Sequence, residues 1–213
     1  MNKNYLREQL KKYPGFFGRN GKFYQSLDGV VSEDEARRPT TERLTKYGVL
    51  DVINKDTDIL DIGCNAGFIS LTAAKKAKSV LGLESEPELA NIANGAKSIV
   101  NQSNCEFQNI KFENFETTKK YDVIFTLAIH HWVKLGFVQF FDKVMKMMKQ
   151  DSYLMFESHN TKDQAFDADI NGKIWYLNQF FKIVNHGHEE TDEKQKMDRE
   201  FYLLKRKRKP NGM

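Results

Sequence analysis

The sequence contains a glycine-rich turn of the kind that binds nucleoside ligands. The apolar run 59–62 ends at Gly63, and Gly67 precedes a helical pattern, which gives the order strand, tight turn, helix. This arrangement brings backbone N–H groups and a helix N-terminus against a small ligand. A second apolar run ends at Glu84, and an acidic residue at this point binds the ribose hydroxyls in nucleoside-binding folds. Together, the two features predict a site for a nucleoside-containing cofactor.

An alternation of strand and helix patterns positions these residues. Two strand-like runs near the end, 180–185 and 199–206, have no helix between them, so they must pair antiparallel. We therefore expect an α/β fold: a Rossmann-like, doubly wound and mostly parallel seven-stranded sheet with a reversed last strand and helices on both faces. The other expected strands cover 58–63, 79–84, 104–108, 121–127 and 152–157, and the expected helices cover 39–53, 68–77, 87–102, 136–149 and 162–178.

In these features the sequence resembles the class I, seven-stranded S-adenosylmethionine-dependent methyltransferases over roughly residues 39–207. The segment DIGCNAG, from Asp61 to Gly67, looks like the first motif of that family, with Asn65 in place of the middle glycine. Asparagine tolerates a left-handed backbone better than most residues, so the substitution is mild. Glu84 matches the acid on the ribose hydroxyls, 121–125 matches the fourth-strand motif, and the final strand pair matches the reversed seventh strand.

The resemblance implies S-adenosyl-L-methionine as cofactor and S-adenosyl-L-homocysteine as product. This cofactor carries no phosphate, and the turn agrees, because the residues between its glycines are small and uncharged. The alternatives are an NAD site or a site that has lost its ligand. The cofactor-binding residues that the resemblance implies are Asp61, Gly63, Cys64, Asn65, Gly67, Glu84, Ser85, Asn109, Ile110 and Leu127. Tyr24 and Arg38, which precede the matching region, are added as further candidates.

The first 38 residues precede the predicted sheet, and we expect them to form a helical and aromatic lid segment. Tyr24 is the candidate for a lid over the cofactor. Arg38, with Arg37 and Arg43, could hold the cofactor carboxylate or an anionic acceptor, or could simply be solvated charges. The expected organisation is therefore this lid at 1–38, a methyltransferase domain at 39–209 and a short tail at 210–213.

The methyl acceptor should lie at the carboxyl edge of the sheet, where ligands of open parallel sheets bind. His130 and His131 follow one predicted strand, and Glu157 ends the next. A histidine could take a proton from a hydroxyl acceptor, and Glu157 could orient or assist it. We therefore name these three residues as catalytic candidates, with a packing role as the alternative for His131. Methyl transfer is an in-line displacement in which positioning does much of the work.

The same edge raises the question of a metal, because His159 lies close by in sequence. Adjacent histidines on an extended segment point in opposite directions, so His130 and His131 should not reach one ion. The paired-glutamate motif of metal-dependent RNA methyltransferases is missing. We therefore expect no metal.

Composition bears on the cellular location and the possible partners of the protein. The chain has 213 residues, a formal net charge of +4 and two cysteines. We expect reduced thiols and a cytoplasmic location, because the sequence shows neither a signal peptide nor an apolar run long enough for a membrane span. Basic residues concentrate in 1–23 and 194–213, where solubilising charge is the simpler interpretation and RNA binding the alternative.

The leading functional hypothesis is O-methylation of a hydroxyl on a small molecule or glycan. The alternative is an RNA or RNA 5′-phosphate methyltransferase, because 131–135 and the DIGCN turn resemble enzymes that methylate the 5′ γ-phosphate of small RNAs. A third hypothesis is a non-catalytic adenosylmethionine-binding module or partner subunit. The sequence leaves the acceptor and the oligomeric state open.

Overall fold

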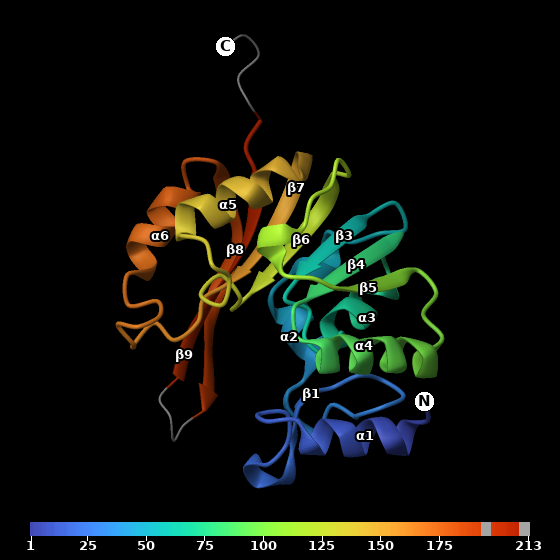
Figure 1. The fold of residues 1–213 in the computed structure, drawn as a ribbon. Coiled ribbons are helices and arrows are strands. Elements are labelled where there is room, and N and C mark those ends of the chain that lie inside the picture. The colour runs from blue at the N-terminus through green and yellow to red at the C-terminus, as the bar shows by residue number, and fades with distance from the viewer. Residues whose placement is uncertain (193–196, 209–213) are drawn as a thin grey trace.

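The computed structural model describes residues 1–192 and 197–208 and is built around a seven-stranded sheet. Its strands follow the order β5-β4-β3-β6-β7-β9-β8 (Figure 1). Neighbouring strands are parallel except where β9 pairs with β7 and β8, to both of which it is antiparallel. The predicted sheet with one reversed strand is therefore confirmed. The strands are β3 (Asp58–Ile62), β4 (Ser79–Glu84), β5 (Cys105–Asn109), β6 (Tyr121–Leu127), β7 (Met148–Glu157), β8 (Phe181–Asp192) and β9 (Met197–Arg206).

Helices cover both faces of this sheet, as predicted (Figure 1). Because successive side chains of a strand point to opposite faces, Ile59 and Leu60 of β3 belong to two different apolar clusters. Helices α1 to α4 pack on the face of Ile59, and α5 and α6 pack on the face of Leu60. The helices are α1 (Lys3–Lys12), α2 (Thr40–Lys46), α3 (Phe68–Ala74), α4 (Pro87–Val100), α5 (Phe137–Lys146) and α6 (Ile170–Leu177).

Most elements lie where the sequence predicts them, and local chemistry sets their ends. Pro87 starts α4, where its missing N–H costs nothing, and Asn101 ends the helix in a left-handed conformation at φ 52°. Several expected boundaries were wrong, among them the end of the helix expected at 39–53, which stops at Lys46. Strand β7 begins at Met148 instead of 152 and passes through an irregularity at Asp151, whose φ is +59°. Helix α6 begins only after Asp169, whose side chain caps it by accepting a hydrogen bond from the Gly172 N–H.

The N-terminal segment packs on the sheet domain and shares its core. Helix α1 lies along α4 (Figure 1), and Leu6 and Leu10 are fully buried. Phe16 makes an edge contact with Phe68 of α3, with 6.3 Å between ring centroids. A short parallel pair, β1 (Phe23–Gln25) and β2 (Ala36–Arg38), was not expected from the sequence. Three 3₁₀ turns complete the described elements: η1 (Arg19–Gly21), η2 (Val49–Asp51) and η3 (Phe112–Asn114).

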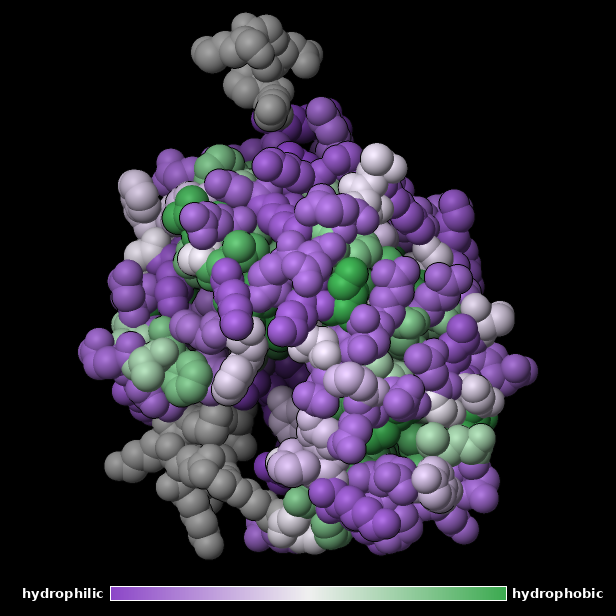
Figure 2. Space-filling model, in the orientation of Figure 1, coloured by the Kyte–Doolittle hydropathy of each residue, from purple (hydrophilic) through white to green (hydrophobic). Residues whose placement is uncertain are grey.

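The surface seen in Figure 2 is mostly hydrophilic, and its hydrophobic residues form small separate groups. A hollow opens near the centre of this face. Within residues 1–192 and 197–208, no helix is both long enough and apolar enough to cross a membrane.

A buried ion cluster joins the N-terminal segment to the last strands. Glu157, at the end of β7 and fully buried, accepts hydrogen bonds from Arg38 at 3.1 Å and from Arg199 at 2.8 Å. Arg43 and the hydroxyl of Tyr47 donate to the other carboxylate oxygen. Burial alone would raise the pKa of Glu157, but the three guanidinium groups hold it well below its usual value. We call these five residues the Glu157 cluster.

Replacing the carboxylate should destabilise the fold. Glu157→Gln removes the carboxylate that three buried guanidinium groups share and leaves only Glu189 beside Arg38, so we expect the free energy of unfolding to fall by about 3–5 kcal/mol. Urea denaturation at pH 7 measures this loss. The matched control is Glu106→Gln on edge strand β5, which is exposed and should change stability by no more than about 0.5 kcal/mol. Equal stability of the two variants would contradict the role given to Glu157.

The same variant has a pH signature. The unfolded chain binds a proton at the ordinary glutamate pKa of about 4, whereas the folded chain binds one only at much lower pH. The stability that Glu157 contributes is therefore present above about pH 4 and declines as the pH falls further. The difference in the free energy of unfolding between wild type and Glu157→Gln should therefore become smaller as the pH falls below about 4.

The aromatic core under α5 offers a second test. Phe140 is fully buried, whereas Val138 on the same helix is 49% exposed. We expect Phe140→Ala to lower the free energy of unfolding by about 3–5 kcal/mol, because it removes buried surface and leaves a cavity. Val138→Ala should stay within about 0.5 kcal/mol of wild type. Chemical denaturation that shows similar losses for both would contradict the packing described for this face.

Candidate functional site

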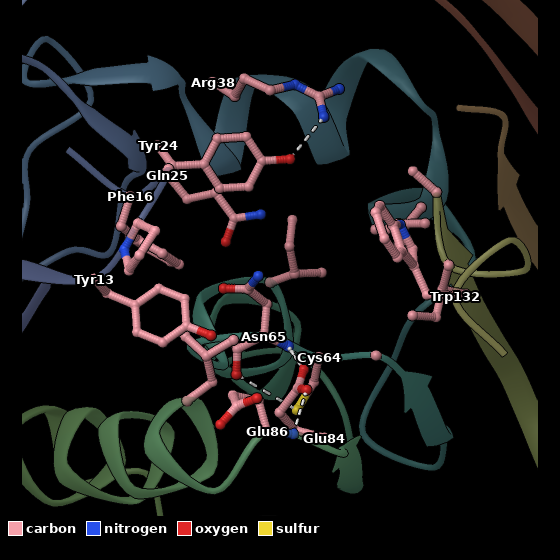
Figure 3. A pocket seen from close by; sticks show the side chains of 18 of the residues that line it. Tyr13, Phe16, Tyr24, Gln25, Arg38, Cys64, Asn65, Glu84, Glu86 and Trp132 are labelled. Carbon is pink, nitrogen blue, oxygen red and sulfur yellow. Dashed lines mark hydrogen bonds between the residues drawn. The ribbon is translucent and has the colours of Figure 1, made fainter. Parts of the chain in front are cut away.

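A cavity of about 970 Å³ lies at the carboxyl ends of β3, β4 and β6, between them and the N-terminal segment. Its size suits a cofactor together with part of an acceptor. Figure 3 shows its side chains converging from both sides on a common open space. Of the residues predicted to bind the cofactor, those that line it are Asp61, Gly63, Cys64, Asn65, Glu84, Ser85, Leu127, Tyr24 and Arg38.

The turn after β3 has the backbone that its sequence requires. Gly63, Asn65 and Gly67 all have positive φ, at 73°, 56° and 75°. This region favours glycine and tolerates asparagine, so Asn65 fits the place of a glycine. A Cβ atom added to Gly63 would lie 2.4 Å from a side-chain carbon of Ile129. The glycine therefore lets the Ile129 side chain pack directly against the turn.

Two acids hold this turn in place. The Glu84 carboxylate accepts hydrogen bonds from the backbone N–H of Asn65 at 2.8 Å and of Glu86 at 2.9 Å (Figure 3). Asp61 accepts a hydrogen bond of 2.5 Å from the Ser70 hydroxyl. Burial raises the pKa of Asp61 to about 7, although this hydrogen bond opposes the shift. Hydrogen bonds within the chain thus hold the turn in its conformation.

Three of the predicted cofactor residues do not line the main cavity. Gly67 instead permits close packing, because a Cβ there would lie 2.5 Å from Phe107. Asn109 donates from its side chain to the Glu84 carbonyl at 2.9 Å. Ile110 lines a smaller cavity of about 130 Å³, which shares Gly63 with the large one. A role for Ile110 beside the adenine therefore stays a prediction.

The far end of the cavity is positively charged. Figure 3 places Arg38 and Tyr24 opposite Glu84 and Glu86. Burial alone would raise the pKa of Tyr24, but the guanidinium groups of Arg38, Arg199 and Arg43 lower it to about 7. A ligand with positive and negative groups at suitable positions would match this separation of charge.

The two predicted catalytic histidines contact a buried aspartate. His130 and His131 each place Nε2 at 3.0 Å from Asp167 Oδ1, and neither ring is among the residues that line the two cavities. The expectation that adjacent histidines point apart was wrong, because the chain turns sharply after β6, where Ala128 has a φ of +54°. Burial keeps the pKa of His130 below its usual value.

These side chains also form a compact group of potential metal ligands. The ligand atoms of His130, His131 and Asp167 lie within 4.8 Å of one another. The ammonium group of Lys173 already contacts the same Asp167 oxygen, and a cation there would have to displace it. The expectation that the chain needs no metal therefore stays a prediction.

Glu157 differs from its expected placement. The sequence put its carboxylate toward the acceptor, but the carboxylate is fully buried in the Glu157 cluster and does not line either cavity. Both of its oxygens accept hydrogen bonds from Arg or Tyr donors. A carboxylate with a strongly lowered pKa is a poor proton carrier at neutral pH. Its contacts assign it to positioning the arginines.

Two polar residues that sequence reasoning left out of the predicted site line this cavity. His159 follows β7, and its ring stacks on Phe166 with centroids 3.9 Å apart. Burial, reinforced by Arg199, lowers the pKa of His159 to about 4. Arg199 comes from β9. His159 could have been found from its position two residues beyond Glu157, whereas Arg199 could not, because only the pairing of β9 with β7 brings it here.

Comparison with known proteins gives one family. A family model described as a methyltransferase domain matches residues 53–203. The chain is 26% identical to a malonyl-[acyl-carrier protein] O-methyltransferase of Calditerrivibrio nitroreducens, over 71% of this chain and 62% of that protein. It is 25% identical to the (S)-coclaurine N-methyltransferase of Papaver somniferum, over 61% of this chain and 37% of that protein. The chain thus spans only part of the length of these curated relatives.

Solved structures share the fold at low sequence identity. The N-methyltransferase NodS of Bradyrhizobium japonicum WM9, in complex with S-adenosyl-L-homocysteine, matches with a TM-score of 0.64 and 16% identity, over 97% of this chain and 99% of that one. The bifunctional kinase-methyltransferase WbdD matches with a TM-score of 0.70 and 18% identity, over 93% of this chain and 45% of that one. With its sheet order and glycine turn, the chain belongs to the class I S-adenosylmethionine-dependent methyltransferase family.

Proposed function

We propose that the chain is an active methyltransferase that uses S-adenosyl-L-methionine to methylate an oxygen of a small-molecule or glycan acceptor. The observation that carries this proposal is the imidazole of His159, which lines the same cavity as the turn at Gly63. The two cysteines, Cys64 and Cys105, are buried free thiols, which supports the cytoplasmic location expected from the sequence.

The cavity fits this cofactor in its chemistry. Glu84 and Ser85 lie where ribose hydroxyls would bind, and the cavity beside Gly63 leaves room for the methionine portion. At the opposite end, Arg38 would attract the carboxylate of the cofactor (Figure 3). When bound, adenosylmethionine supplies an electrophilic methyl group on a sulfonium.

His159 would act on the acceptor. An imidazole with a lowered pKa is unprotonated at neutral pH and can accept the proton that a hydroxyl loses. Its Nδ1 has no hydrogen-bond partner among the described residues. Ile129 and Trp132, which also line the cavity, would hold the acceptor in line for transfer.

Charge favours oxygen over nitrogen as the atom methylated. The relatives of this chain include both O- and N-methyltransferases, so the family alone does not decide between them. An amine acceptor is mostly a cation at neutral pH, and the arginines of this cavity, Arg43 and Arg199 among them, would repel it. A neutral or anionic acceptor with a hydroxyl group meets no such barrier.

A binding measurement and a transfer screen test the proposal. We expect calorimetry to show that the intact chain binds adenosylmethionine and adenosylhomocysteine. We also expect tritiated methyl from adenosylmethionine to enter a small-molecule or glycan fraction of cell extract as an ether or ester. Failure to bind either ligand would contradict the enzyme assignment, and a methylated amine as the sole product would contradict the oxygen assignment.

The role of His159 gives a kinetic prediction. His159→Asn removes the basic nitrogen and should lower kcat by about 100-fold or more, while the affinity for adenosylhomocysteine stays within about threefold. Wild-type kcat should fall as acid protonates His159, and the variant should lose this acid limb. The control is His186→Asn on β8, outside the cavity lining, which should leave kcat unchanged. An unchanged kcat for His159→Asn would show that the transfer needs no base here.

A further inference from the structure

Two arginines of the cavity have hydrogen-bonding capacity that the described residues leave unused. Arg43 and Arg199 both line the cavity and are only 4% and 9% exposed. Each donates from one nitrogen to Glu157. Among the described residues, neither Arg43 Nη1 nor Arg199 Nε has a hydrogen-bond partner, although both atoms are buried. Buried donors of charged groups are normally paired, so these atoms point to a missing partner.

The charge of the cluster points to the same conclusion. Three guanidinium groups in the Glu157 cluster, those of Arg38, Arg43 and Arg199, all form ion pairs with the carboxylate of Glu157. Two carboxylates contact them, Glu157 and Glu189, and the second pairs with Arg38. Three positive charges against two negative ones leave an excess of one positive charge. The lowered pKa of Tyr24 is a second sign of this field. An anion would balance it.

The position of Arg199 separates it from the cofactor turn. The cofactor turn follows β3, whereas Arg199 lies on β9, which is three strands away in the order β3-β6-β7-β9. Neighbouring strands lie about 4.8 Å apart, so the two elements are separated by about 14 Å across the sheet. Arg199 also lies beside His159, to which we assign the acceptor. Arg199 therefore lies at the His159 side of the cavity, away from the cofactor turn.

We propose that the methyl acceptor carries an anionic oxygen group, a phosphate or a carboxylate, that binds Arg199 and Arg43 beside His159. This inference rests on the proposed function and narrows its substrate class. The planar fork of a guanidinium group matches such groups with two parallel hydrogen bonds. An anion held there would also favour the protonated form of His159 as it takes up the acceptor proton.

Direct anion binding tests the proposal without an acceptor. The intact protein is saturated with adenosylhomocysteine, so that its carboxylate already occupies its own place. Inorganic phosphate, and acetate in a second series, are added at constant ionic strength while the imidazole resonances are followed by NMR. We expect a saturable shift of the His159 signal, assigned through His159→Asn.

Variants locate the anion. Arg199→Gln should weaken phosphate binding by about 10- to 100-fold, the range for a charge-assisted hydrogen bond, with adenosylhomocysteine affinity within about threefold of wild type. Arg199→Lys keeps the positive charge but loses the planar guanidinium group, so its affinity for phosphate should lie between those of wild type and Arg199→Gln. The control, Arg208→Gln, removes one charge from an exposed side chain paired with Asp151 and should bind phosphate as wild type does.

Several outcomes would overturn this inference. One is no saturable shift in wild type, and another is an equal shift in Arg199→Gln. A loss of adenosylhomocysteine binding in Arg199→Gln would assign the arginine to the cofactor carboxylate instead. In the transfer screen, the acceptor should bind an anion-exchange resin and survive ribonuclease. A neutral acceptor would refute the inference and leave methyl transfer itself established. An RNA acceptor would contradict the small-molecule or glycan class of the proposed function, and no transfer at all would contradict the proposed function itself.

Discussion

The carboxylate of Glu157 is the interaction on which the architecture of the site depends. It is a fully buried charge whose partners come from β2, α2 and β9, elements far apart in sequence. A buried carboxylate is costly unless its partners are all in place, so the fold must bring these elements together. The N-terminal segment is thereby fixed over the sheet, and the cavity between them acquires its cationic wall.

This constraint explains why the cavity has two different halves. Around β3 and β4, backbone geometry prevails: positive φ angles, a missing Cβ at Gly63 and a turn held by Glu84. Around β7 and β9, side-chain charge prevails, with Arg199 and His159 on neighbouring strand ends. The first half suits a ligand that all members of a family share. The second half can vary with the acceptor without disturbing the first.

The sequence predicts the first half far better than the second. The turn from Asp61 to Gly67 is a local signal, and the structure has the backbone that it requires. The mostly parallel sheet with its reversed last strand followed from alternating patterns and the missing last helix. Contacts between distant segments could not be predicted in this way. Glu157 looked like an acid facing the acceptor, because nothing local shows that Arg38 and Arg199 converge on it. The sharp turn at Ala128, which brings two histidines together, has no glycine to mark it.

The strand order has a consequence for how the molecule is assembled. Strand β9 follows the other strands of this sheet in sequence but lies between β7 and β8 and not at the edge of the sheet. Strand β8 therefore cannot take its final place when it is first made, since its only neighbour in this sheet has not yet been synthesised. The β3–β4 half can form early, as N-terminal parts of a chain commonly do. Arg199, which lies on β9, therefore reaches the cavity only when this strand enters the sheet.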